Sequence, residues 1–198
     1  MQRRSLPVIF AVLLALALIL PSKSNATEPH DRPGWLIGFS VGGGPGTAGG
    51  NTDEGAGLAF RAGRMIGTHF MLHMELPSWV RRNKRNETFN SLSIVQMAIA
   101  GTFYPGKPDD ASGGIYIRGG FGFGSLQVHM RSSFGSTFTG GESGSGILLG
   151  GGYEFRLKRR FALGTGIQFN KLYLDNITSS LQFTTIHIDL NWYLGANK

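Results

Sequence analysis

The sequence predicts an all-β protein, a single antiparallel eight-stranded up-and-down β-barrel that spans a membrane and follows a cleaved signal peptide. Three observations lead to this fold class. Eight segments alternate large apolar residues with small or polar ones, which is the pattern of a two-faced β-strand. No stretch of the chain after its N-terminal segment shows the apolar period of an amphipathic helix. Many of the 31 glycines fall at the non-apolar positions of the alternating segments.

The amino-acid composition excludes several classes of protein and of binding site. The chain has 198 residues, no cysteine, 16 % charged residues and a net charge of +7. This length suits one domain. The lack of cysteine excludes a disulfide framework, a thiolate zinc site and an iron–sulfur cluster. A mean hydropathy of -0.04 is too low for a bundle of membrane helices.

Residues 1–26 have the features of a secretory signal peptide. Two arginines near the start precede the apolar residues 6–20, and Ala26 ends a small-residue cleavage site. The apolar run is shorter than the roughly 20 residues of a membrane-spanning helix. Cleavage would remove three of the 19 basic residues and leave a net charge of +4, which weakens the case for nucleic acid as a partner. Residues 27–34 would form a short periplasmic lead.

The first four strands are expected at residues 35–43, 57–65, 69–76 and 92–104. In the first strand, large apolar residues occupy the odd positions from Trp35 to Val41, and Gly38, Ser40 and Gly42 lie on the other face. The other three strands repeat this alternation, so each one has an apolar face and a small or polar face.

The last four strands are expected at residues 115–128, 146–157, 161–173 and 181–194. In the final strand, large apolar residues occupy the even positions from Ile186 to Leu194. Leu181 and Phe183 fall on the opposite parity, and we therefore expect a β-bulge or a loop entry near Thr184.

The residues on the two faces of each strand indicate which face lines the barrel lumen and which faces the membrane. The non-apolar face consists mainly of glycine and other small residues, which suits the crowded lumen of a narrow barrel better than a solvated surface. The apolar face would then meet lipid, and most strands reach the length of about 9–11 residues that spans a bilayer. The alternative is a soluble secreted or periplasmic lipocalin-like barrel with the faces reversed, which would bind a small apolar ligand.

Connections and aromatic residues extend this prediction. Outer loops are expected at residues 44–56, 77–91, 129–145 and 174–180, and inner turns at 66–68, 105–114 and 158–160. The outer loops are expected to be long and the inner turns short, except that 174–180 is a short loop and 105–114 is a long turn. An aromatic girdle at the inner interface is expected from Trp35, Phe103, Tyr104, Phe155, Phe161, Trp192 and Tyr193.

The signal peptide, the eight alternating strands and the closing stretch at 186–194 together resemble the small eight-stranded outer-membrane β-barrel proteins of Gram-negative bacteria, the group with OmpA-, OmpX- and OmpW-like domains. The resemblance covers residues 35–194, and residues 195–198 form a tail where that family usually ends on an aromatic residue. It implies a monomer in the cell outer membrane that contacts outer-membrane lipids and lipopolysaccharide, with the barrel-assembly machinery as a partner during biogenesis.

Charged residues on the small face predict a structural polar network inside the lumen. The network is expected from Arg61, His73, Glu75, Arg118, Glu154 and Arg156. Because an isolated buried charge costs several kcal/mol, these groups should pair with one another. Such pairs would plug the lumen, and a narrow channel is the alternative.

The sequence predicts no enzyme, no cofactor and no metal site. His187 and Asp189 lack a serine two residues after the histidine, and the glycine–serine pattern at 141–145 is an incomplete nucleophile elbow. His69 and His73 are four residues apart, a spacing that pairs ligands on a helix but not on a strand.

A basic cluster in the second outer loop is the remaining candidate site. Arg81, Arg82, Lys84 and Arg85 could contact lipopolysaccharide phosphates or another anionic surface polymer. The sequence therefore predicts a structural or surface-interaction role through the outer loops, with a surface partner whose identity it does not specify.

Overall fold

The computed structural model describes residues 34–48, 50–66, 69–85, 88–106, 114–131, 137–158, 160–175 and 180–194, and it describes their side chains except at 82–90 and 130–138. The strands are β1 Trp35–Ala48, β2 Asn51–Ile66, β3 Phe70–Arg85, β4 Thr88–Phe103, β5 Gly114–Arg131, β6 Thr137–Lys158, β7 Phe161–Leu174 and β8 Ser180–Leu194. The predicted signal peptide at 1–26, most of the lead at 27–34 and the tail at 195–198 lie outside the described residues. In the described part of the chain, no helix is both long enough and apolar enough to cross a membrane.

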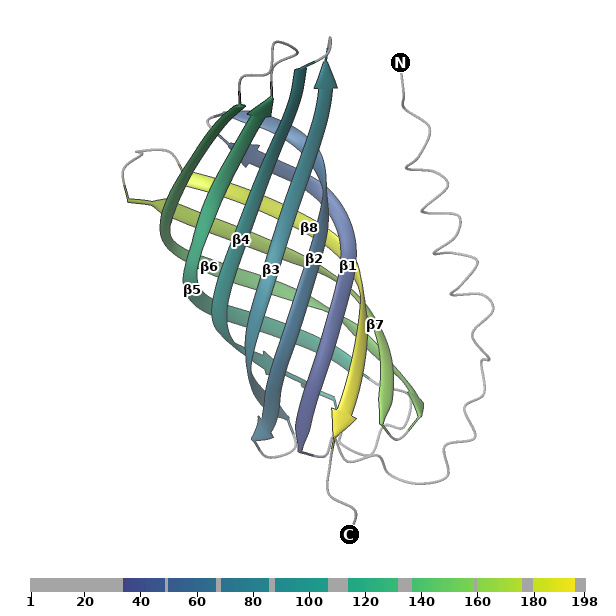
Figure 1. Cartoon of the computed structure of the whole chain (residues 1–198). Helices are drawn as coiled ribbons and strands as arrows, with labels where there is room; N and C mark the ends of the chain where they lie inside the picture. Colours follow the sequence, from purple (N-terminus) through teal and green to yellow (C-terminus); the bar gives the residue numbers. More distant parts are fainter. Residues whose placement is uncertain are drawn as a thin grey trace.

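The eight strands form a closed antiparallel barrel in sequence order, as predicted (Figure 1). β8 closes the barrel against β1 through a ladder that runs from Trp35–Leu194 to Thr47–Gln182. Closure leaves no edge strand with unpaired backbone groups. We call the end where β1 begins and β8 ends the terminal end, at the bottom of Figure 1, and the opposite end the hairpin end.

The apolar face of every strand lies on the outside of the barrel, which confirms the membrane-facing pattern and contradicts the soluble lipocalin-like alternative. Twenty-eight large apolar side chains are exposed there, for example Phe123 at 72 % and Trp192 at 58 %. A soluble monomer rarely exposes an apolar patch of more than a few hundred Å². The outward positions from Val95 to Phe103 on β4 are apolar apart from one glycine. At about 3.3 Å per residue and a tilt near 45°, these nine residues span about 20–25 Å, the height of a membrane band.

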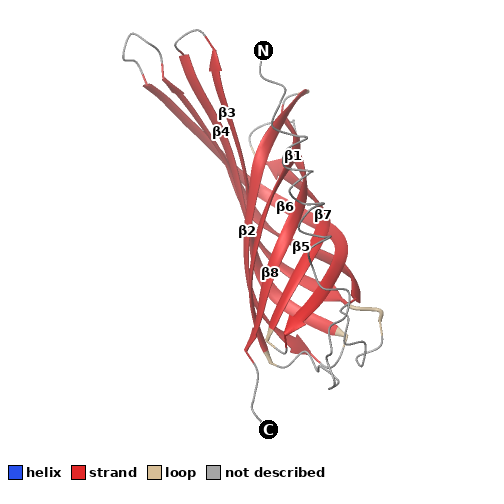
Figure 2. Cartoon of the chain, turned by 90° about the vertical axis from the view of Figure 1, so that its right-hand side faces the viewer, coloured by secondary structure: helices blue, strands red, loops and turns tan. Residues whose placement is uncertain are grey.

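This apolar belt ends at one level near the hairpin end, where the outward residues become polar. The change occurs at Ser78, Ser93, Ser125, Ser145, Lys171 and Thr184. Beyond Ser78, β3 continues for seven residues to Arg85, about 23 Å along the strand. Figure 2 shows β3 and β4, together with the neighbouring hairpin of β5 and β6, extending past the rest of the barrel in this direction.

The expected long outer loops are largely strand, and this part of the prediction is wrong. β1 and β2 extend to Ala48 and from Asn51, and β3 and β4 extend to Arg85 and from Thr88. Most of 129–145 belongs to β5 and β6. These segments lack an apolar period, but their backbone groups still pair with the neighbouring strand, so the ladder continues where the side-chain pattern stops. The longest connection is instead 104–113, at the terminal end.

The bulge expected near Thr184 is also absent from the β7–β8 ladder, which keeps one register from Phe161–Trp192 to Tyr173–Ser180. Leu181 and Phe183 are 3 % exposed and face inward, on the same side as His187. Their parity differs from the outward apolar residues because the barrel interior itself becomes apolar toward the hairpin end.

The inward side chains form an apolar layer at each end, and between the layers lie mainly polar residues and the small apolar cluster of Ala98, Ala100 and Leu148. The layer toward the terminal end consists of Leu36, Met65, Met71, Tyr104, Tyr116, Ala162 and Tyr193. The layer toward the hairpin end consists of Trp79, Ile94, Leu172, Leu174, Leu181 and Phe183. Tyr104 and Tyr193 were expected at the membrane interface, but they are 2 % and 0 % exposed and their hydroxyls lie 3.4 Å apart inside the barrel.

Candidate functional site

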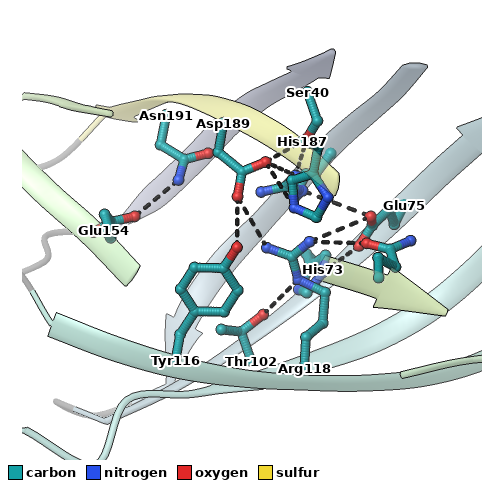
Figure 3. A network of polar contacts seen from close by, with 12 residues as sticks. Ser40, His73, Glu75, Thr102, Tyr116, Arg118, Glu154, His187, Asp189 and Asn191 are labelled. Carbon is teal, nitrogen blue, oxygen red and sulfur yellow. Dashed lines mark hydrogen bonds and ion pairs between the residues drawn. The ribbon is translucent and has the colours of Figure 1, made fainter. Parts of the chain in front are cut away.

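Asp189 of β8 is the centre of a buried polar cluster in the middle of the barrel (Figure 3). Its Oδ1 atom accepts hydrogen bonds from Ser40 Oγ at 2.6 Å and from Arg61 Nη2 at 2.7 Å. Arg61 Nη2 also contacts Ser40 Oγ. The Oδ2 atom accepts a hydrogen bond from the Tyr116 hydroxyl at 2.8 Å and lies 3.8 Å from Arg118 Nη2. The side chains that meet here come from β1, β2, β5 and β8, so only the closed barrel brings them together.

Glu75 of β3 is the second carboxylate of this cluster. It lies 3.7 Å from Arg61 Nε, 3.4 Å from Arg118 Nη1 and 3.2 Å from His73 Nε2. Two carboxylates therefore face two guanidinium groups, and all four side chains are at most 3 % exposed. Such balance is required because an unpaired charge in the interior would cost several kcal/mol.

A second polar group surrounds Glu154 of β6, nearer the terminal end. Asn191 Nδ2 and the Tyr193 hydroxyl each donate to Glu154 Oε2 at 2.8 Å. Arg156 Nε lies 3.4 Å from Glu154 Oε1, and its guanidinium stacks 3.9 Å from the centre of the Tyr193 ring. The structure thus brings Arg61, His73, Glu75 and Arg118 together and places Glu154 and Arg156 in a second group.

Asp189 is absent from the network that the sequence predicts, although its carboxylate accepts three hydrogen bonds of 2.6 to 2.8 Å. The signal was present, because Asp189 shares the inward parity of the last strand with His187 and Asn191. Its pairing could not be read from the chain, since Arg61 is 128 residues away.

The geometry around Asp189 does not activate a nucleophile. Ser40 Oγ donates its hydrogen bond to the Asp189 carboxylate, while His187 Nε2 lies 3.4 Å from the same carboxylate. A serine nucleophile would need the imidazole as its proton acceptor. In the described part of the chain, no group of three histidine, cysteine or acidic residues could hold a metal ion.

The interior is tightly packed around these groups. A cavity of about 10 Å³ lies beside Ser40, Gln168 and His187, which is room for about one water molecule. Glycines allow this packing. A Cβ atom added at Gly166 would lie 2.5 Å from the Tyr116 hydroxyl, and one added at Gly122 would lie 1.9 Å from a backbone oxygen of β4.

The predicted basic cluster lies on the part of β3 that extends beyond the apolar belt. Arg81 Nη1 forms an ion pair with Asp53 of β2 at 2.5 Å, and both side chains are partly exposed. The side chains of Arg82, Lys84 and Arg85 lie outside the described residues. Their backbone positions pair with β4, and the register continues to β5 through Lys84–Phe89 and Phe89–Arg131.

Comparison with known proteins gives one family and one fold. Residues 10–193 match the family described as outer membrane protein beta-barrel domain. No curated protein sequence matches the chain. Among solved structures, the chain is similar to Ail, the attachment invasion locus protein of Yersinia pestis, in complex with the heparin analogue sucrose octasulfate, at 10 % identity and a TM-score of 0.59 over 81 % of this chain and 99 % of that chain. It is also similar to Neisserial surface protein A, at 9 % identity and a TM-score of 0.59 over 81 % of this chain and 97 % of that chain.

Proposed function

The chain belongs to the outer membrane protein β-barrel family, and on this basis we propose that it is a non-enzymatic surface protein that binds anionic polymers at its hairpin end. It is an integral protein of the Gram-negative outer membrane. The proposal has three parts, which are its orientation, a closed lumen and a basic binding surface. Each part rests on different residues and has its own test.

Orientation follows from the position of the apolar belt. The belt begins at the terminal end, and the strands continue past it only at the hairpin end. Outer-membrane barrels keep their termini on the periplasmic side, so the hairpin end would face outward. Residues 1–26 then act as the signal peptide and 27–34 as the periplasmic lead.

The orientation is tested by labelling single cysteines. Because the chain has no cysteine, a cysteine introduced at Thr139 should react with a membrane-impermeant maleimide in intact cells. A cysteine introduced at Gly106 should not react in intact cells. Labelling at Gly106 and not at Thr139 would contradict this orientation.

A closed lumen is supported by the buried polar groups and the two apolar layers. A barrel of eight strands has an interior only wide enough for its own side chains. Here Arg61, Glu75 and Asp189 are 0 % exposed. Trp79, in the apolar layer toward the hairpin end, is 1 % exposed. We expect no stepwise conductance from the purified protein in planar bilayers. Reproducible steps would instead favour the narrow channel.

The basic binding surface is carried by one observation, the extension of β3 to β6 beyond the apolar belt. The extension lifts Arg82, Lys84 and Arg85 away from the bilayer, and the ladder places Arg131 two strands from Lys84. Guanidinium and ammonium groups on a projecting sheet are suited to sulfate and phosphate groups. Ail, which has a similar fold, forms a complex with the heparin analogue sucrose octasulfate.

The test measures binding of sucrose octasulfate and of lipopolysaccharide to the protein in detergent micelles. We expect the triple variant Arg82→Ser, Lys84→Ser and Arg85→Ser to bind at least ten times more weakly than the original protein. Binding by the original protein should weaken with added salt, because exposed charges are screened. The matched control is Lys158→Ser, which removes a cation at the terminal end. Equal affinity of the triple variant and the original protein would contradict the proposal.

A further inference from the structure

Arg64 is the one charged side chain that faces outward within the apolar belt, among the residues that the structure describes. It lies on β2 two residues before the strand ends, directly between Trp35 of β1 and Leu72 of β3 in the ladder. Its side chain is exposed. In the described part of the chain, no carboxylate forms an ion pair with it, in contrast to the inward arginines on the same barrel.

A hollow opens on the lipid-facing surface beside this arginine. It is a shallow, open depression, so a molecule bound in it would remain in contact with the surrounding lipid. Residues of β1 to β4 line it, among them Trp35, Ala62, Arg64, Leu72, Met74 and Ile99. Ala62 leaves the space, because it is the smallest outward residue between Leu58 and Ile66 on β2.

The two ends of the hollow differ in chemistry. Met74 and Ile99 belong to the apolar belt and are 44 % and 57 % exposed. Trp35 is 58 % exposed and lies next to Arg64 at the terminal end, where an amphipathic ring suits the membrane interface. A guanidinium group at that level can reach the phosphate groups of the membrane surface with two parallel hydrogen bonds.

We propose that this hollow is a binding site for one anionic phospholipid, with the lipid phosphate on Arg64 and an acyl chain along Ala62, Met74 and Ile99. Charge complementarity selects the headgroup, since Arg64 is a cation without a carboxylate partner in the described chain. The apolar floor selects a lipid over a soluble phosphate ester. The site lies at the terminal end, so it takes its lipid from the periplasmic leaflet, and in this respect it rests on the proposed orientation.

The test titrates the delipidated, folded protein with dioleoyl phosphatidylglycerol in detergent and counts bound lipid by native mass spectrometry. We expect one lipid per barrel to survive transfer to the gas phase. Arg64→Gln should weaken this binding at least tenfold, and Ala62→Phe should abolish it by occupying the hollow. The matched control is Lys171→Gln, which removes an outward cation at the other boundary of the belt and should leave lipid binding unchanged. Heat-modifiable gel mobility verifies that each variant is folded.

Two results would overturn the proposal. One is equal lipid binding by Arg64→Gln and the original protein. The other is glycerol 3-phosphate competing at the concentration at which the lipid binds, which would show that the hollow takes no part. Sucrose octasulfate binding is measured on the same variants and should stay unchanged in Arg64→Gln. Failure of the lipid site is therefore distinguishable from failure of the basic surface at the hairpin end.

Discussion

Replacing Asp189 by asparagine should be among the most destabilising conservative changes in this barrel. The substitution keeps the side-chain volume but leaves Arg61 and Arg118 facing a single carboxylate, Glu75. It also replaces the carboxylate that accepts the hydrogen bonds of Ser40 and Tyr116, at 2.6 and 2.8 Å, by a neutral amide. Removing one partner of a buried ion pair costs about 3–5 kcal/mol. We therefore expect the free energy of unfolding to fall by about 3–5 kcal/mol.

The measurement is urea unfolding of the protein in lipid vesicles, followed by tryptophan fluorescence. A double-mutant cycle with Arg61→Gln isolates the pair. The double variant removes one charge of each sign and leaves Glu75 with Arg118 at 3.4 Å, a balanced pair. The two changes should therefore cost less together than the sum of the single changes, with a coupling energy of about 1–3 kcal/mol.

The matched control is Asp53→Asn, which breaks the exposed ion pair with Arg81 at the hairpin end. An exposed pair contributes about 0–1 kcal/mol, so this variant should unfold close to the original protein. Two results would refute the reasoning. One is strictly additive effects of the Asp189 and Arg61 changes, and the other is an Asp189→Asn cost no larger than that of Asp53→Asn.

Three further changes probe the other layers of the barrel. Trp79→Ala should lower the free energy of unfolding by about 3–5 kcal/mol, because the side chain is 1 % exposed within the hairpin-end apolar layer. Gly166→Ala should cost about 1–3 kcal/mol, since its Cβ would meet the Tyr116 hydroxyl at 2.5 Å. Leu190→Arg should cost about 2–4 kcal/mol in vesicles, because Leu190 is the middle outward residue of the membrane-spanning part of β8.

Each of these changes has a counterpart on the barrel surface. Trp192→Ala removes a tryptophan that is 58 % exposed and should cost less than Trp79→Ala. Gly119→Ala places its Cβ 3.5 Å from Leu149, an ordinary contact, and should be tolerated. Leu194→Arg puts the charge at the end of β8 near the interface, where the cost falls to about 0–1 kcal/mol. If a control variant lowers the free energy of unfolding as much as the variant it is paired with, the position assigned to that residue in the barrel is wrong.

The membrane-spanning part of the fold could be predicted from the sequence because lipid imposes a strict period of two. Every outward position from Val95 to Phe103 is apolar or small, and the other strands follow the same alternation with few exceptions, such as Arg64 on β2. The extensions beyond the belt could not be predicted in this way. There Ser91 pairs with both Arg82 and His129 through the backbone alone, and water on the outer side removes the need for apolar residues.

The interior could be predicted only in part. Parity identifies which residues face inward, and it placed Arg61, Glu75 and Arg118 on the inner face of their strands. It does not show that one carboxylate would accept hydrogen bonds from three different strands, because those contacts depend on the shear of the closed barrel. Leu181 and Phe183 suggested a bulge because an apolar inward layer at the hairpin end was not expected, and they in fact continue the inward face.

The most direct test of the central account is the accessibility of spin labels along β5. The chain has no cysteine, so single cysteines at the odd positions from Ile115 to Phe123, which face outward, can each carry a nitroxide as the only label. The experiment measures how strongly two reagents relax the nitroxide at each position in vesicles. One is oxygen, which concentrates in lipid, and the other is a water-soluble nickel complex. The account predicts high oxygen and low nickel accessibility at all of these odd positions. High nickel accessibility at the odd positions would show that the apolar face meets water, and would contradict the assignment of this chain as a barrel that presents that face to lipid.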